Sequence, residues 1–529
     1  MPHVKKFSKQ RLTRGGLGAV SGLLAAFAAL AVAEVVAGVV RPQAGPVLAV
    51  GGAAIDRTPA AVKDWAIRSF GSDDKLMLRL GILLVLGALA AALGLLGLRH
   101  RPAGAIGVLL FGVVGAVAAL TRPDTGGVPD VLPSLAGAAA GGLLLYVLTG
   151  RLTLASGRAP DTAGAPGWDR RGFLTAAAAA AAASTGAGAL GRGLAASHGK
   201  EAAASRAAVA LPTPASPATP VPRGAALRIP GVSPFVTSNQ DFYRVDTALV
   251  VPKVDAGRWR LRIHGKGVAA PLDLAFRDLL RRELIERDIT LTCVSNEVGG
   301  PYVGNARWIG VPLDDLLREA GVRPPSQGGP ADQLVSRSVD GMTIGTPVED
   351  VMDGRDAMLA VGMNGEPLPL EHGFPVRMVV PGLYGYVSAC KWIQDIEMTT
   401  FDAYDPYWVK RNWAREAPVK TQARIDTPKP FARPKAGTVT VAGVAWAQHR
   451  GIDRVEIQVD DGLWQDADLA AQAGPDTWRL WSWSWKALPG SHTLTVRATD
   501  GAGRVQTTDR ARTVPDGASG RHSVVITVD

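Results

Sequence analysis

The stretch "EHGFPVRMVVPGLYGYVSACKWI", residues 371–393, decides the fold of the C-terminal half of this 529-residue chain. It contains one apolar strand, "GFPVRMVVPG", and leads into another, "KWIQDIEMT". Upstream, "GRWRLRIHG" alternates like a strand, whereas "LDLAFRDLLRRELI" and "VPLDDLLREAGV" have helical spacing. Residues 227–428 therefore predict one mixed α+β domain of about 200 residues, a normal size for a single core.

The end of the chain, residues 429–529, has a different pattern. Short alternating strands follow one another with turn residues between them: "GTVTVAGVAW", "DRVEIQVD", "WSWSWKAL", "HTLTVRATDGAG" and "HSVVITV". The pattern predicts an all-β immunoglobulin-like sandwich without the usual cysteine pair. The two cysteines, Cys293 and Cys390, lie outside it, so at most one disulfide is expected.

The N-terminal part, residues 1–165, is expected to be a four-helix transmembrane region. Its apolar runs have the length of membrane spans and lie at roughly 17–40, 80–98, 103–120 and 131–149. Basic segments at the N-terminus, at "RHRP" and at "GRLTLASGR" alternate along these runs, which places all three in the cytoplasm. The runs lack histidine, so no haem held by paired imidazoles is expected.

The whole-chain composition argues against a nucleic-acid partner. The net charge is +10, with 47% hydrophobic and 20% charged residues. Part of the positive charge flanks the apolar runs, and no basic stripe with interleaved aromatic residues is found. The composition suits a chain that is part membrane protein and part globular protein.

A fifth apolar run follows two adjacent arginines in "WDRRGFLTAAAAAAAASTGAGALG", which begins at residue 168. Arg170 and Arg171 resemble a twin-arginine export signal, which carries folded cargo. Residues 166–196 are therefore expected to be a signal and fifth membrane helix, with all later residues outside the cytoplasm. Such a signal predicts a cofactor bound before export, but the arginines also fit the basic flank of an ordinary helix. Residues 197–226 are Pro- and Ala-rich and predict an extended linker.

Cys293 is the first candidate for chemistry. It ends the β-rich run "DITLTC" and opens the Gly/Asn loop "VSNEVGG". A thiolate in this place suits a soft metal. The alternatives are a buried cysteine that acts as a small hydrophobe and a disulfide with Cys390.

From about residue 235 onward the chain resembles the sulfite oxidase superfamily of molybdopterin-dependent oxidoreductases. The resemblance rests on ordered segments: "NQDFYRVDTAL" at 239–249, "LTCVSN" at 291–296, "RWIGVPLDDLLREAGV" at 307–322 and "MNGEPLPLEHGFPVRMVVPGLYGYVSACKWI" at 363–393. It implies a molybdenum–molybdopterin cofactor. It also implies that the C-terminal sandwich is a dimerisation domain, so a homodimer is expected.

The resemblance assigns roles position by position. Cys293 matches the catalytic protein thiolate that binds molybdenum. The cofactor-binding set that it implies consists of Asn239, Tyr243, Arg244, Asp340, His372, Arg377 and Lys391. A phosphate on the cofactor needs fixed cationic donors, which arginine and lysine supply.

One segment departs from the family pattern. Sulfite oxidases proper have Cys-x-Gly-Asn-Arg, whereas this chain has "CVSNE", with Glu297 in place of the arginine. A carboxylate there repels an anion, so sulfite is disfavoured as the substrate. No Cys-x-x-Cys-His motif occurs, so electrons are expected to pass to a separate partner that the sequence does not identify.

These features predict a membrane-anchored molybdenum oxidoreductase with its catalytic domain outside the cytoplasm, acting on a small-molecule substrate by oxygen-atom transfer. Two alternatives remain open: a sulfoxide-type oxide reductase, and a surface binding module that keeps the fold without the cofactor.

Overall fold

The computed structural model describes residues 2–58, 62, 74–122, 124–153 and 170–529. These form two compact units. The first contains Met1–Glu201 and Ala248–Val250, and the second contains Ala202–Thr247 and Val251–Asp529. The basic segment expected after the fourth span and the start of the predicted export signal, residues 154–169, lie outside the described residues.

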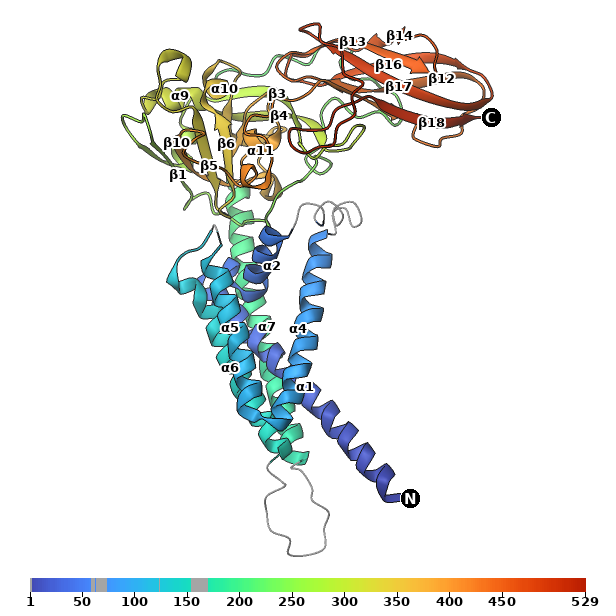
Figure 1. Ribbon diagram of the computed structural model, residues 1–529. Coiled ribbons are helices and arrows are strands. Elements are labelled where there is room, and N and C mark those ends of the chain that lie inside the picture. The colour runs from blue at the N-terminus through green and yellow to red at the C-terminus, as the bar shows by residue number, and fades with distance from the viewer. Residues whose placement is uncertain (1, 59–61, 63–73, 123, 154–169) are drawn as a thin grey trace, which may run out of the picture. The chain divides into compact units, whose positions relative to one another are not determined.

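The first unit is a helical bundle (Figure 1). Among the described residues, five helical segments are long and apolar enough to cross a membrane. The helices are α1 (Pro2–Val40), α2 (Pro46–Arg57), α4 (Asp74–Arg99), α5 (Arg101–Leu120), α6 (Leu132–Thr153) and α7 (Arg170–Ala207). The five predicted apolar helices are therefore confirmed, and α2 is an additional apolar helix too short to span a bilayer.

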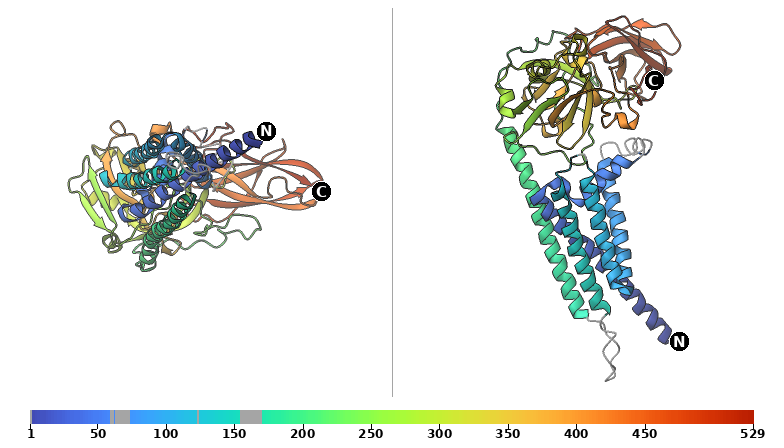
Figure 2. Two further views of the ribbon diagram at one scale, coloured as in Figure 1. Left: turned by 90° about the horizontal axis from the view of Figure 1, so that it is seen from below. Right: turned by 60° about the vertical axis from the view of Figure 1, so that its left-hand side comes forward.

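Glycines bring the helices of this bundle together. In Figure 1 and in the right-hand view of Figure 2, α5, α6 and α7 run side by side and α1 crosses the bundle at an angle. A Cβ atom on Gly22 of α1 would lie 1.9 Å from the carbonyl oxygen of Ala90 in α4. A Cβ atom on Gly137 of α6 would lie 2.4 Å from the carbonyl oxygen of Ala29 in α1. Such close backbone approach is the usual basis of helix association in membranes, and any larger side chain at these positions would separate the helices.

The segment 197–226 differs from the expected extended linker. Its first part continues α7 to Ala207, because the Ala-rich sequence "EAAASRA" favours a helix. In its second part Leu211 and Val221 pack against the core of the second unit. Ser216 forms a parallel β-bridge with Ile285. This half of the segment is therefore part of a folded domain.

The α+β part of the second unit contains two sheets. One has the strand order β2-β1-β10-β5-β6, and the other has the order β3-β4-β7-β8 with β9 also paired to β7. The strands are β1 (Arg260–Gly265), β2 (Leu272–Ala275), β3 (Ile285–Thr292), β4 (Val303–Pro312), β5 (Gln333–Ser338), β6 (Thr343–Pro347), β7 (Met358–Met363), β8 (Glu366–Pro367), β9 (Arg377–Val379) and β10 (Ile393–Thr399).

Short helices connect these strands: α8 (Phe276–Leu280), α9 (Leu313–Glu319), α10 (Val348–Met352) and α11 (Gly385–Ser388). The predicted helix over "VPLDDLLREAGV" corresponds to α9. The helical pattern predicted over "LDLAFRDLLRRELI" differs, because this stretch divides into β2, the short α8 and the start of β3. Strand pairing of Leu272–Ala275 with β1 outweighs the local helical spacing.

The C-terminal part is an all-β sandwich of two four-stranded sheets, ordered β11-β12-β16-β15 and β14-β13-β17-β18. Its strands are β11 (Gln422–Thr427), β12 (Gly437–Trp446), β13 (Ile452–Val459), β14 (Gln465–Asp466), β15 (Asp468–Leu469), β16 (Arg479–Ala487), β17 (Gly490–Asp500) and β18 (His522–Val528). The predicted fold class is thus confirmed throughout. The sandwich begins at Gln422 rather than at residue 429, because β11 pairs with β12.

The core of the α+β part extends into the sandwich. Trp446 and Trp478 of the sandwich belong to the same buried apolar cluster as Trp308 of β4. A second cluster, which contains Trp481, lies between the two sheets of the sandwich. The shared cluster makes the contact between these two parts an extension of the α+β core.

Candidate active site

Cys293 directly follows β3 and is buried at 8% relative exposure. Its backbone N–H donates to the carbonyl oxygen of Tyr302, 3.0 Å away, so the loop that it opens closes back onto the strand pair β3–β4. Burial raises the pKa of the Cys293 thiol, while hydrogen bonds from Ser295 and the charge of Lys391 act in the opposite direction. Ser295 and Lys391 therefore favour the thiolate, which is the form that binds a metal.

The second cysteine is not joined to the first. Cys293 and Cys390 are both free thiols, so the alternative of a disulfide between them is not realised in the structure. Burial raises the pKa of Cys390 to about 12, which keeps its thiol protonated at neutral pH.

His372 lies in a short 3-10 turn (Leu370–His372) and is 3% exposed. Its Nε2 atom is 2.8 Å from the carbonyl oxygen of Asn239, and the edge of its ring meets Phe242 with centroids 5.7 Å apart. A carbonyl only accepts hydrogen bonds, so Nε2 carries the proton. Burial lowers the pKa of His372 to about 4, so the ring is neutral at physiological pH.

Arg377, the first residue of β9, is a buried cation at 5% exposure. Its guanidinium lies over the ring of Trp308, 4.9 Å from the centroid, and its Nη1 donates to the carbonyl oxygen of His372 at 3.2 Å. Nε has no hydrogen-bond partner among the described residues, and no carboxylate of those residues pairs with this side chain. Burial lowers the pKa of Arg377 to about 10. A buried guanidinium without an acidic partner is suited to bind an anionic ligand.

Lys391 is half-buried and has a carboxylate partner. Its Nζ lies 2.8 Å from Oδ2 of Asp246 and 4.6 Å from the ring centroid of Trp392. Arg244, whose side chain is half-exposed, is 3.9 Å from the same Asp246 oxygen. The structure thus joins Arg244 and Lys391 through a carboxylate that sequence reasoning did not single out.

Two other predicted residues, Tyr243 and Asp340, differ in which cysteine they lie near. Tyr243 stacks on Phe242 with centroids 5.2 Å apart, and burial followed by proximity to Cys293 raises the pKa of its hydroxyl, which therefore stays neutral. Asp340 lies in the turn between β5 and β6, where its Oδ1 accepts from the backbone N–H of Met342 at 3.3 Å. Its charge raises the pKa of Cys390. Tyr243 is thus close to the candidate metal ligand, and Asp340 lies on the Cys390 side.

The donor set fits a metal that arrives with an anionic organic cofactor. Cys293 is a single thiol, and no group of three or more His, Cys, Asp or Glu side chains in the described part of the chain is arranged to hold an ion. The other metal ligands would have to come from the cofactor. Arg377 supplies an unpaired buried positive charge, and neutral His372 next to it supplies uncharged polar contacts. This combination suits a pterin with a phosphate.

Sequence reasoning missed three residues of this site: Ser295, Asp246 and Trp308. Ser295 stands where sulfite oxidases proper have glycine in Cys-x-Gly-Asn-Arg, and the resemblance assigns it no role. Its position two residues after Cys293 is the local signal that its hydroxyl turns back to the thiol. Asp246 and Trp308 carry no such signal, because their partners Lys391 and Arg377 are distant in sequence.

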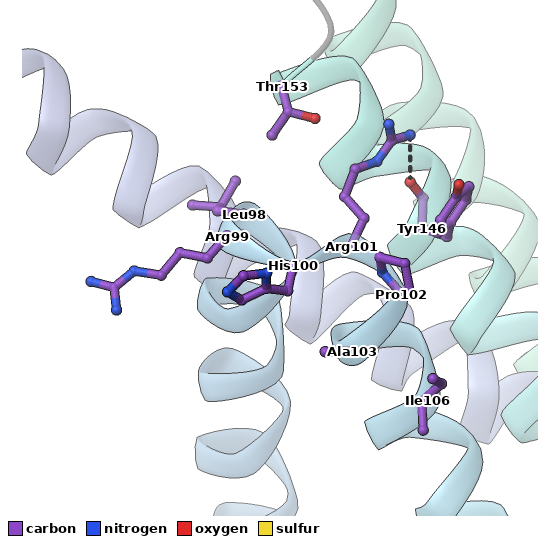
Figure 3. Close-up of a pocket in the computed structure, with 9 residues that line it drawn as sticks. All are labelled: Leu98, Arg99, His100, Arg101, Pro102, Ala103, Ile106, Tyr146 and Thr153. Atoms are coloured by element: carbon purple, nitrogen blue, oxygen red, sulfur yellow. Dashed lines mark hydrogen bonds between the residues drawn. The ribbon is translucent and has the colours of Figure 1, made fainter.

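A cavity of about 670 Å³ lies in the first unit, between the α4–α5 turn and the end of α6 (Figure 3). Arg101 bends back so that its Nη2 donates to the carbonyl oxygen of Tyr146 at 3.4 Å, whereas Arg99 points away from it in Figure 3. The lining residues are those of the predicted "RHRP" turn, the neighbouring residues Leu98, Ala103 and Ile106, and Tyr146 and Thr153 of α6. The cavity contains none of the predicted cofactor-binding residues.

Comparison with known families divides the second unit in two. Residues 248–408 match the family described as "Oxidoreductase molybdopterin binding domain". Residues 422–496 match the family described as "Bacterial Ig domain".

Several known proteins are similar to this chain. The mitochondrial sulfite oxidase of Mus musculus is 30% identical over 288 residues, which is 47% of this chain and 52% of that protein. An uncharacterized oxidoreductase of Bacillus subtilis, YuiH, is 31% identical over 159 residues, which is 30% of this chain and 74% of that protein. Among solved structures, the sulfane dehydrogenase SoxCD of Paracoccus pantotrophus shares 26% identity with a TM-score of 0.48, covering 56% of this chain and 83% of that one. The chain spans about half the length of the sulfite oxidases that it matches.

Proposed function

Because the chain belongs to the sulfite oxidase superfamily of molybdopterin-dependent oxidoreductases, we propose that it is a membrane-anchored enzyme that transfers an oxygen atom to or from a small molecule. When bound, the molybdenum cofactor supplies the two-electron redox chemistry. Cys293 is the proposed metal ligand. Asn239, Tyr243, Arg244, Asp340, His372, Arg377 and Lys391 are the proposed cofactor contacts.

The observation that carries this proposal is the buried Arg377 with its unpaired Nε. A folded protein keeps an unpaired buried charge at a cost of several kcal/mol, unless a ligand with the opposite charge completes the site. A cofactor phosphate is such a ligand. In the proposed role, Arg377 and Lys391 hold the phosphate, and neutral His372, whose ring is oriented by the bond from Nε2–H to the Asn239 carbonyl oxygen, contacts the pterin.

The proposed substrate is a neutral oxide, such as a sulfoxide, rather than sulfite. Burial is the main cause that raises the pKa of the Tyr243 and Tyr384 hydroxyls; at Tyr243 the charge of Cys293 is the next cause, and at Tyr384 the charge of Asp516 contributes before that of Cys293. Both hydroxyls therefore remain neutral donors that can hydrogen-bond an uncharged oxygen of a substrate. Glu297, in place of the arginine of sulfite oxidases proper, also opposes an anionic substrate.

The proposed location is the cell membrane, with the catalytic domain outside the cytoplasm. Support comes from the five apolar helices and the alternation of the basic loops. The Arg170–Arg171 pair is the proposed signal for export of the folded, cofactor-loaded domain, and a homodimer through the sandwich is the proposed assembly.

The deciding experiment is metal analysis of the full chain, purified in detergent from a host that makes the molybdenum cofactor. We expect about one molybdenum per chain, and a strong loss of it in Arg377→Met. Folded wild-type protein without molybdenum would favour the cofactor-free binding module. Turnover assays on the loaded protein with dimethyl sulfoxide and with sulfite then separate the two substrate classes. Efficient oxidation of sulfite would contradict the neutral-substrate proposal.

A further inference from the structure

The loop that carries Cys293 connects β3 to β4 and is fixed at both ends. Inside the loop, the Asn296 N–H donates to the Cys293 carbonyl oxygen at 3.0 Å, and the Tyr302 N–H donates to Oδ1 of Asn296 at 2.8 Å. These bonds define the local turn. They do not fix the turn relative to the rest of the protein, so the contacts at the two ends of the loop determine where the thiol points.

At the first end, the contact comes from Gln448 in the β12–β13 connection of the sandwich. Its Nε2 donates to the Thr290 carbonyl oxygen at 2.9 Å and to the Thr292 hydroxyl at 2.8 Å. Thr292 is the residue immediately before Cys293. Gln448 is 1% exposed, so both bonds are shielded from water. Trp478 adds a third bond to this end, because its backbone N–H donates to the Thr290 hydroxyl at 2.7 Å.

At the second end, the contact comes from Arg424 on β11. Its Nη1 donates to the Gly300 carbonyl oxygen at 2.8 Å. Asp426 at 2.7 Å and the Ser233 hydroxyl at 2.9 Å hold the same guanidinium in place. Arg424 thus has an acidic partner and a fixed orientation, and its remaining donor is directed at the loop.

His522 of β18 lies against the same end. A Cβ atom on Gly299 would lie 2.2 Å from Cδ2 of His522, so only glycine fits between the ring and the loop. The backbone φ of Gly299 is +80°, a conformation that also favours glycine. His522 is itself fixed, because its Nδ1 accepts from the Ile425 N–H at 3.0 Å. The loop therefore rests on two side chains of the sandwich at this end.

We infer that Gln448 and Arg424 are positioning residues for the Cys293 thiolate, and that the sandwich is a structural part of the molybdenum site in addition to any role in dimerisation. The inference rests on the proposed function of Cys293 as metal ligand. A metal ligand has to be held within about half an ångström of its working position by residues that are themselves fixed. Arg424 meets this requirement because Asp426 and Ser233 hold its guanidinium while Nη1 bonds to Gly300 of the loop, and Gln448 meets it because it is fully buried and bonds to Thr290 and Thr292 at the end of β3 that leads into Cys293.

The test compares Gln448→Met and Arg424→Lys in the full-length, cofactor-loaded protein. Methionine keeps the length of glutamine but donates no hydrogen bond. Lysine keeps the charge beside Asp426 but lacks the fork that reaches both Gly300 and Ser233. The matched controls are Gln458→Met, whose Nε2 donates to Gly462 in an exposed turn of the same sandwich, and Arg433→Lys, which loses the fork at exposed Asp529.

The readouts are molybdenum retained after dialysis, the electron paramagnetic resonance spectrum of Mo(V) after partial reduction with dithionite, and the midpoint of thermal unfolding. We expect metal retention to fall about tenfold in the two test variants, the effect typical of groups that orient a metal ligand. We also expect the Mo(V) spectrum to shift or split, because the thiolate takes more than one orientation. Both controls should keep the wild-type spectrum and retention.

The outcomes separate this inference from the proposed function. Wild-type protein without molybdenum would overturn the proposed function and this inference with it. Loaded wild type with unchanged spectra and retention in both test variants would overturn the inference alone. Equal losses in the controls would do the same, since they would show a general effect of loosening the sandwich. If Gln448→Met does not fold, the milder Arg424→Lys decides the matter by the same spectral criterion.

Discussion

The Arg377→Met variant tests whether the positive charge of Arg377 serves to bind the cofactor or to stabilise the fold. Burial lowers the pKa of Arg377 from 12.5 to about 10. At about 1.4 kcal/mol per pKa unit, its charge costs the cofactor-free fold about 3 kcal/mol. The side chain recovers part of this cost through the bond to His372 and the contact with Trp308, each worth about 1 kcal/mol. The Arg377→Met variant should therefore be as stable without cofactor as the wild type, or more stable by about 1 kcal/mol.

The assay uses the full chain produced in two hosts, one able and one unable to make the molybdenum cofactor. We expect cofactor-free Arg377→Met to unfold at or above the wild-type midpoint temperature. We expect the loaded wild type to unfold at a higher temperature than the loaded variant, which should contain little molybdenum. Arg450→Met is the matched control, because Arg450 is bonded to fully buried Asp500 at 2.8 Å. Removing this arginine leaves a buried carboxylate unpaired and should destabilise both forms. A cofactor-free Arg377→Met protein that is destabilised as much as Arg450→Met would refute the reasoning, because Arg377 would then be an ordinary structural cation.

Three further predictions use other parts of the chain. Cys293→Ser should abolish turnover and lower the bound molybdenum, whereas Cys390→Ser should change turnover and molybdenum content little. Metal analysis and turnover assays of the two variants check this, and equal losses of molybdenum in both would contradict the assignment of Cys293 as the ligand. Replacing both Arg170 and Arg171 with lysine should leave the first four spans inserted but keep the C-terminal domain in the cytoplasm, which protease access in spheroplasts measures. Normal export of this variant would show that the arginine pair is only the basic flank of the helix. Burial, and after it the charge of Arg424, lowers the pKa of His522 to about 4 in the folded protein, whereas the pKa in the unfolded chain is about 6.5. Between these two pH values the unfolded chain binds a proton that the folded chain excludes. The free energy of unfolding should therefore fall as the pH falls through this range. Unfolding midpoints between pH 7 and pH 4 should show a smaller slope for His522→Gln than for the wild type, and identical slopes would contradict this assignment.

The sequence predicted the five long apolar helices because the length of an apolar run is a local signal. It did not predict α2 (Pro46–Arg57), whose apolar run is shorter than a span. It also did not predict that Gly22 and Gly137 bring helix backbones into contact, since a glycine in an apolar run looks the same whether it faces lipid or another helix.

In the second unit, ordered motifs led to Cys293, His372 and Arg377; the structure buries all three and bonds Arg377 to His372. The link of Lys391 to Asp246 joins positions 145 residues apart. Gln448 is 156 residues from the threonine hydroxyl that it bonds. Contacts of this kind depend on how the domains pack against each other, and neither composition nor periodicity carries that information. The helical pattern over Leu272–Ala275 was misleading for the same reason, because pairing with β1 decides its conformation.

The shared core and the bonds from Gln448 and Arg424 bear on how such an enzyme evolves. Immunoglobulin-like domains are often exchanged between proteins as independent cassettes, since their folds are self-sufficient. In this chain a recombination event that replaced residues 422–529 with an unrelated sandwich would reproduce the strands but remove Gln448, Arg424 and His522 from the Cys293 loop. We therefore expect the loop and its sandwich to be inherited together, with a substitution on one side matched by a compensating change on the other. Lineages of this enzyme should accordingly show paired changes across this boundary and few exchanges of the C-terminal domain.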